Sequence, residues 1–163
     1  MVQTIVNKKQ ALGMEGEFYD NSPRRVSPYI VTGTAAGEAA AIGRVYTEVA
    51  GKNQAAVLGG TGNFAGIAVE PKNYPVTGGL TPSLELADGT AAQLCRMGLI
   101  FVKSTTAVTP GQFALYDTAT GEIQSTSETD STKYPTGTAL IPGAVFKFFS
   151  AAVGEVAVLQ ITD

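Results

Sequence analysis

The stretch Ser83-Leu84-Glu85-Leu86-Ala87-Asp88-Gly89 carries the strongest local signal for the fold. Residues 83–86 alternate polar and apolar side chains, which is the period of a strand. The Asp88-Gly89 pair can adopt the positive φ angles of a tight hairpin turn. Residues 90–97 can then form either a short helix ended by a glycine or the return strand. We favour the strand, because the apolar run 99–102 follows too closely for a helix and its loop.

Short strands are expected on both sides of this stretch. The 19 glycines and 8 prolines are scattered along the chain and divide it into short segments, a spacing typical of all-β folds with many turns. The candidate strands are residues 42–47, 55–58, 64–69, 112–116, 122–125, 145–149 and 156–161, of which the last four form two hairpins. The sequence therefore predicts an all-β fold, a compact β-barrel or β-sandwich of short antiparallel strands.

Residues 1–28 differ from the rest of the chain. They are polar, contain Pro23 and Pro28, and show no sustained period. We interpret them as an extended N-terminal arm outside the β domain, with residues 29–163 forming a single β domain.

No catalytic constellation is visible in the sequence. The chain has no histidine, which removes the commonest general base and most zinc sites. The glycines of residues 59–66 miss the spacing of a nucleotide-binding loop, and no helix is expected after them. The acidic groups Glu15, Glu17 and Asp20, and Glu128 with Asp130, are better interpreted as solvated carboxylates. We therefore expect no enzyme activity, no cofactor and no metal.

Composition also argues against several partners. The chain has only 11 basic residues and a net charge of −3. It is therefore poorly suited to binding nucleic acid, because basic side chains must replace the counterions of the phosphates. The most apolar stretch, residues 145–161, is interrupted by Lys147 and Glu155, so no membrane span of ~20 apolar residues exists. Cys95 is the single cysteine, so no intrachain disulfide can form, as suits assembly in a reducing cytoplasm.

Several motifs in chain order resemble the structural cement, or capsid decoration, proteins of tailed bacteriophages. These motifs, which extend over nearly the whole sequence, are Gly13-Met14-Glu15-Gly16-Glu17, Ser22-Pro23-Arg24-Arg25, Ala41-Ile42-Gly43-Arg44-Val45-Tyr46, Phe64-Ala65-Gly66-Ile67-Ala68-Val69, Pro71-Lys72-Asn73-Tyr74, Leu86-Ala87-Asp88-Gly89, Gly98-Leu99-Ile100-Phe101-Val102, Ile141-Pro142-Gly143-Ala144-Val145-Phe146 and Gly154-Glu155-Val156-Ala157-Val158-Leu159.

The resemblance implies a β domain that docks on the outer surface of a mature phage head, in the virion, after assembly in the host cytoplasm. It implies bridging of neighbouring major capsid subunits, and self-association into trimers as the first expectation and dimers as the second. We place the capsid contact in the arm, at its basic residues Lys8, Lys9, Arg24 and Arg25. The two arginines are the stronger candidates, because Pro23 stiffens the chain beside them and guanidinium groups bind carboxylates in a bidentate fork. Alternatively, the arm covers its own β domain or a sister subunit.

Two other classes stay open. One is a carbohydrate- or surface-binding module of a phage fibre or adhesin, which would display exposed aromatic rings. Against it, the chain has no tryptophan, and Phe101, Phe113, Phe146 and Phe148 lie in strand-like runs that predict burial in the core. The other is a hydrolase of unrecognised type.

Overall fold

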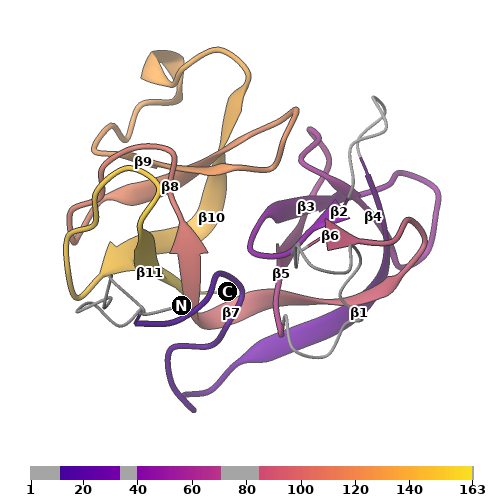
Figure 1. Cartoon of the computed structure of the whole chain (residues 1–163). Helices are drawn as coiled ribbons and strands as arrows, with labels where there is room; N and C mark the ends of the chain where they lie inside the picture. Colours follow the sequence, from indigo (N-terminus) through magenta and orange to yellow (C-terminus); the bar gives the residue numbers. More distant parts are fainter. Residues whose placement is uncertain (1–11, 34–39, 71–84, 163) are drawn as a thin grey trace, which may run out of the picture.

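The computed structural model describes residues 12–33, 40–70 and 85–162, and these form an all-β fold (Figure 1). Their only helical segment is a short 3₁₀ turn, Ser131–Lys133. The strands are β1 Arg25–Thr32, β2 Ala40–Ala41, β3 Val45–Glu48, β4 Ala55–Leu58, β5 Phe64–Ala68, β6 Glu85–Leu86, β7 Ala91–Lys103, β8 Phe113–Asp117, β9 Ile123–Thr126, β10 Thr138–Lys147 and β11 Val156–Ile161. The expected fold class is confirmed.

Strand β7 is shared by two groups of strands, which lie on either side of it in Figure 1. Its first half pairs with β1 and β5. Because β1 also pairs in parallel with β4, the order β1-β4-β3-β5-β7 closes into a ring of five strands. The other named pairings are antiparallel.

The second half of β7 begins the other group, in the order β7-β11-β10-β8-β9. Ser104, directly after β7, forms a parallel bridge with Ile123 of β9. The Thr105 N–H also donates to the Ile123 carbonyl at 2.9 Å. The edge of β9 is therefore covered by the chain that follows β7, which protects a strand edge that would otherwise be open to aggregation.

The buried apolar side chains form two cores. The core inside the five-stranded ring includes Tyr46, Leu58 and Leu94. The core of the second group includes Phe146 and Leu159, and it extends to Val45 and Ile67 of the ring. In β11 the expected face of Ala157, Leu159 and Ile161 belongs to this second core, and Val158 on the opposite face is buried as well. Burial of each large apolar side chain contributes about 1.5–3 kcal/mol relative to exposure.

The two hairpins expected in the second half of the chain are confirmed. β8 pairs with β9 and β10 pairs with β11, both antiparallel. The strand interpretation of residues 90–97 is also confirmed, because all of them except Thr90 lie within β7, which runs unbroken from Ala91 to Lys103.

The turn at Asp88-Gly89 forms, but it does not join a hairpin. Gly89 has φ 77°, and the Thr90 N–H donates to the Ala87 carbonyl at 3.1 Å. The strand before the turn, β6, pairs with β2, whereas β7 pairs with β1, β5 and β11. The turn is held by β1 instead, since the Gly89 N–H donates to the Val31 carbonyl at 2.9 Å. Residues 83 and 84 lie outside the described residues.

Residues 12–28 of the expected arm, which the structure describes, include segments that pair with β7. The Gly16 N–H donates to the Phe101 carbonyl, and the Phe101 N–H donates to the backbone carbonyl of Glu17, both at 2.8 Å. Phe18 packs against the core of the second group, and β1 crosses the expected boundary at residue 28. The pairing segment is only a few residues long and a turn separates it from β1, so no sustained period shows in the sequence. Lys8 and Lys9 lie outside the described residues.

Candidate functional site

Several of the described carboxylates have structural partners. No group of three His, Cys, Asp or Glu side chains suited to a metal ion occurs within the described ranges. Glu15 pairs with Lys103 at 3.6 Å, and Glu128 pairs with Lys133 at 3.2 Å. Hydrogen bonds from the Thr132 backbone and hydroxyl lower the pKa of Asp130, which caps the 3₁₀ turn. Within the same ranges, no helix is long and apolar enough to cross a membrane.

Cys95 is fully buried in β7 and is not available as a nucleophile. Its thiol donates to the Met97 carbonyl at 3.0 Å. Burial raises the pKa of the thiol from 9.0 to about 11, because the charged thiolate is poorly solvated in the core. A neutral, buried thiol is chemically inert.

The raised pKa of Cys95 predicts a loss of stability at high pH. An acid whose folded pKa is raised stabilises the fold below its unfolded pKa and loses that contribution as pH rises through the folded value. The free energy of unfolding, measured by urea titration, should therefore fall between pH 9 and about 11. Burial also raises the pKa of Tyr29 and Tyr116 in the same direction. Cys95→Ala should make the fall shallower; an equally steep fall would show that the thiol does not contribute.

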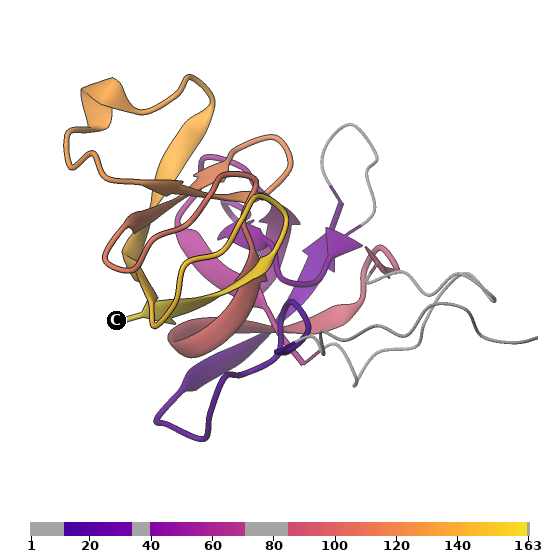
Figure 2. The ribbon, with the colours of Figure 1, turned by 60° about the vertical axis from the view of Figure 1, so that its left-hand side comes forward.

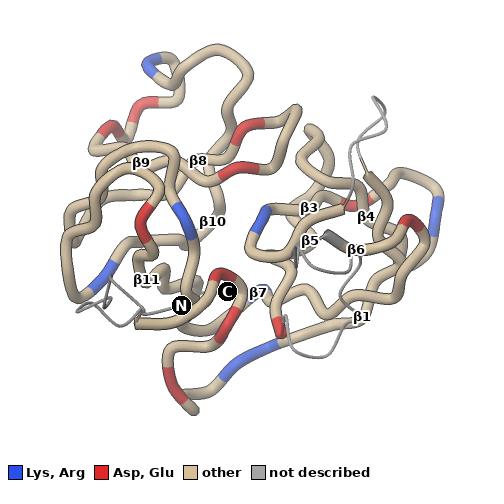
Figure 3. Tube along the Cα trace, in the orientation of Figure 1, with Lys and Arg blue, Asp and Glu red and all other residues tan. Residues whose placement is uncertain are grey.

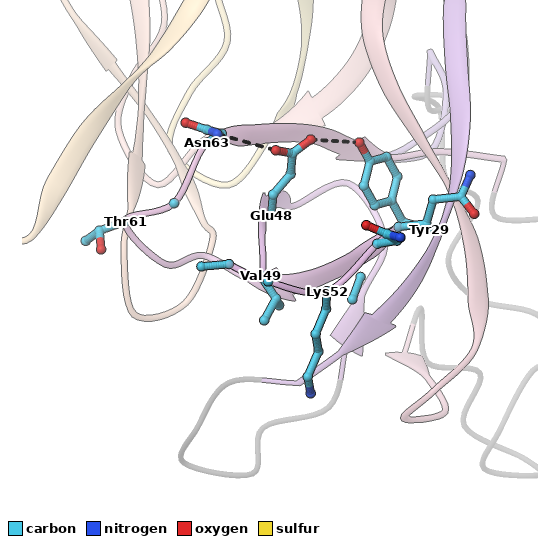
Figure 4. A pocket seen from close by; sticks show the side chains of 12 residues that line it. Tyr29, Glu48, Val49, Lys52, Thr61 and Asn63 are labelled. Atoms are coloured by element: carbon cyan, nitrogen blue, oxygen red, sulfur yellow. Dashed lines mark hydrogen bonds between the residues drawn. The ribbon is translucent and has the colours of Figure 1, made fainter.

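A polar hollow opens at the end of the five-stranded ring (Figure 4). It has a volume of about 630 Å³ and is lined by the end of β3, the loop before β4 and the loop before β5. Glu48 lies in its wall, where its carboxylate accepts from the Tyr29 hydroxyl at 3.0 Å and from the Asn63 amide at 3.4 Å. Figure 4 shows Lys52 pointing away from Glu48. Both carboxylate oxygens are thus used to join β1, β3 and the β4–β5 connection, which is a structural role.

Arg24 is exposed and lies beside Gly98 of β7, just before β1 begins. Its guanidinium carbon is 4.2 Å from the centre of the Phe18 ring. A side chain at Gly98 of β7 would meet the Arg24 Cβ at 3.3 Å. Contact with an aromatic ring holds the cation in place while its N–H groups can still bind a carboxylate. Arg25 follows at the start of β1 and is also exposed; Figure 3 shows this basic stretch leading into β1.

An aromatic stack includes Tyr19, in the segment before this basic turn. Tyr19 and Phe148 are stacked, with ring centres 4.8 Å apart and planes at 18°. Tyr19 also meets Phe101 edge to face at 5.5 Å. Phe148 is 57% exposed, so the expectation that this residue lies in the core is wrong. Phe146, two residues earlier, is fully buried, and Phe101 is nearly so.

Comparison with known proteins identifies the family. The sequence matches the family described as structural cement protein (E217 gp24/Pam3 gp6) over residues 2–162. The chain belongs to this family. A cement protein has a structural role associated with the capsid of a bacteriophage, and a location in the virion follows.

The fold agrees with this family. The cement protein is similar to a chain in the solved structure "The capsid of Myoviridae Phage XM1", with a TM-score of 0.67 and 18% identity, over 100% of this chain and 98% of that one. No curated protein is found to match the sequence.

In the cement protein, the structure places Arg24 against the Phe18 ring, an aromatic contact that the sequence did not single out. Residues 19–24 lie in the indigo loop that leads into β1 (Figure 2). The signal that could have found Tyr19 is its place in a short segment between Gly16 and Pro23. Phe148 had no such signal, because its exposure depends on a backbone angle at the end of β10.

Proposed function

We propose that this protein binds the outer surface of a mature phage head and bridges neighbouring major capsid subunits. The observation that carries this proposal is the family match over nearly the whole chain. A subunit that touches several capsid chains binds a closed lattice far more tightly than it binds one free capsid subunit, because the later contacts are effectively intramolecular. The binding energy then stabilises the expanded shell, and no turnover is required.

We place the capsid contact at Arg24 and Arg25, with Lys8 and Lys9 as further contacts. Both arginines are exposed in a chain of net charge −3. Arginines held on a rigid element lose little freedom when they meet carboxylates, and charge-assisted hydrogen bonds contribute about 1.5–3 kcal/mol each. Acidic side chains of the major capsid protein are the matching chemistry. Trimers, or else dimers, would repeat the contact around a local symmetry axis of the shell.

The test is co-sedimentation with undecorated capsids over a range of protein concentrations. The double change Arg24→Ala and Arg25→Ala should weaken binding by about 10–100-fold, from the loss of charge-assisted hydrogen bonds. Removal of residues 1–11 tests Lys8 and Lys9 while keeping the 16–19 segment that pairs with β7. The matched control is Lys52→Ala, which removes an exposed cation from the hollow in the five-stranded ring.

Each variant is first checked by thermal unfolding, because only a variant that melts like the wild type reports on binding. If both the double arginine variant and the shortened chain saturate capsids as the wild type does, these four residues are not the contact. If the wild type itself does not bind capsids, the proposed function is wrong.

A further inference from the structure

Arg24 lies against two residues from other segments of the chain, Phe18 and Gly98. Its guanidinium carbon lies over the Phe18 ring, 4.2 Å from the ring centre. Gly98 leaves room for the side chain, because a Cβ at this position would come within 3.3 Å of the Arg24 Cβ. Contact with an aromatic ring restricts the orientations that an exposed guanidinium adopts.

The position of Phe18 is fixed by strand pairing and by the core. Three backbone hydrogen bonds of 2.8 to 2.9 Å join residues 16–19 to residues 99–101 of β7, and Phe18 forms an antiparallel bridge with Ile100. The Phe18 side chain packs, partly buried, against the core of the second group. Movement of the ring away from Arg24 would therefore expose apolar surface or break this pairing.

The hydrogen-bonding groups of Arg24 stay available to a partner. Arg24 is exposed, and within residues 12–33, 40–70 and 85–162 its guanidinium forms no hydrogen bond and no ion pair. The N–H groups of a guanidinium form a planar fork that fits a carboxylate. An arginine that is already oriented loses less conformational entropy on binding than a freely rotating one does.

We propose that Phe18 is a positioning residue for capsid binding, which holds the Arg24 guanidinium so that its fork meets one carboxylate of the major capsid protein. This inference rests on the proposed function and names the residue through which Arg24 acts. It also makes the contact specific for arginine. A lysine at position 24 would keep the positive charge, but an ammonium group has no planar fork to pair with both carboxylate oxygens.

The test is a double-mutant cycle, measured as affinity for undecorated capsids. Phe18→Leu keeps an apolar side chain for the core and removes the ring, and it should weaken binding by about 2–10-fold. Arg24→Ala should weaken binding by about tenfold. When Arg24→Ala is already present, Phe18→Leu should have no further effect on affinity, because no guanidinium is left for the ring to orient.

Two further variants separate the ring and the fork from general effects. Phe18→Tyr keeps the ring and should bind as the wild type does, whereas Arg24→Lys should lose nearly as much affinity as Arg24→Ala. The matched control is Phe64→Leu, because Phe64 in β5 also packs, partly buried, against the core of the second group. It should lower the melting temperature as Phe18→Leu does and leave capsid affinity unchanged. All binding is measured well below the lowest melting temperature of the set.

Three outcomes would overturn the inference. If Phe18→Leu binds capsids as the wild type does, the ring does not position Arg24. If Phe18→Leu weakens binding by the same factor with and without Arg24, the ring acts through the fold and not through the guanidinium. If Arg24→Ala binds as the wild type does, Arg24 is not a contact. In each case the wild type still binds and the proposed function stands, whereas a wild type that does not bind capsids contradicts both.

Discussion

Gly121→Ala is expected to lower the free energy of unfolding by about 2–5 kcal/mol, from backbone strain together with overpacking. Gly121 has φ 68°, where any Cβ is strained. A Cβ there would also lie 2.6 Å from the Val45 carbonyl oxygen and 2.9 Å from a Leu58 methyl group. Neither the backbone oxygen nor the buried leucine can move away easily.

The decrease in the free energy of unfolding should be large because Gly121 lies where the two groups of strands meet. The Val45 N–H donates to the Gly121 carbonyl, and the Gly59 N–H donates to the Val45 carbonyl, both at 2.9 Å. A Cβ on Gly59 would in turn come within 3.1 Å of the Gly121 nitrogen. The turn before β9 and the turn after β4 thus approach each other at two glycines, which have no side chains to keep them apart.

The measurement is urea or thermal unfolding, with Gly137→Ala as the control. Gly137 has φ 81°, but a Cβ at this position would have no atom within 4 Å. Its replacement therefore adds backbone strain of about 1–2 kcal/mol and no crowding. The difference in the free energy of unfolding between the two variants therefore measures the cost of crowding the added Cβ at Gly121. Equal losses would mean that the two strand groups are not tightly packed at this point.

Phe146→Ala is expected to lower the free energy of unfolding by about 3–5 kcal/mol, the usual cost of emptying a phenylalanine site in a core. Phe146 is fully buried among residues from β7, β8, β9 and β11. Surrounding strands are fixed by their hydrogen bonds, so the site cannot collapse to fill the cavity. For a domain whose total stability is about 5–15 kcal/mol, this is a large fraction.

Leu140→Ala in the same strand is the control for Phe146→Ala. Leu140 is exposed, and truncation at an exposed site should cost less than about 1 kcal/mol. The two variants are compared by the midpoint of urea unfolding at constant slope. A loss below about 2 kcal/mol at Phe146 would contradict the close packing of the core.

The candidate contact surface could be predicted only in part. Arg24 and Arg25 were identified from their charge and from the neighbouring proline, and both are exposed. Phe148 was expected in the core for a sound local reason. In β10 the side chains of Ala144 and Phe146 point inward, and continued alternation would turn Phe148 the same way. The strand instead ends at Lys147 and the chain turns at a positive φ.

The sequence by itself determined the strands whose signal is local. β4 was predicted at its exact bounds, and the two hairpins β8–β9 and β10–β11 were found from alternation and turn glycines. The absence of histidine already removed the commonest general base and most zinc sites. These properties depend on neighbouring residues, which can be examined within a window of about ten positions.

Tertiary structure alone decided which strands became partners. The turn at Asp88-Gly89 has hairpin chemistry, yet β6 and β7 pair with different strands. The pairing of the 16–19 segment and of β1 with β7 could not be read locally. Strand pairing depends on contacts between residues far apart in the chain, and the order of strands is chosen by the joint burial of both cores.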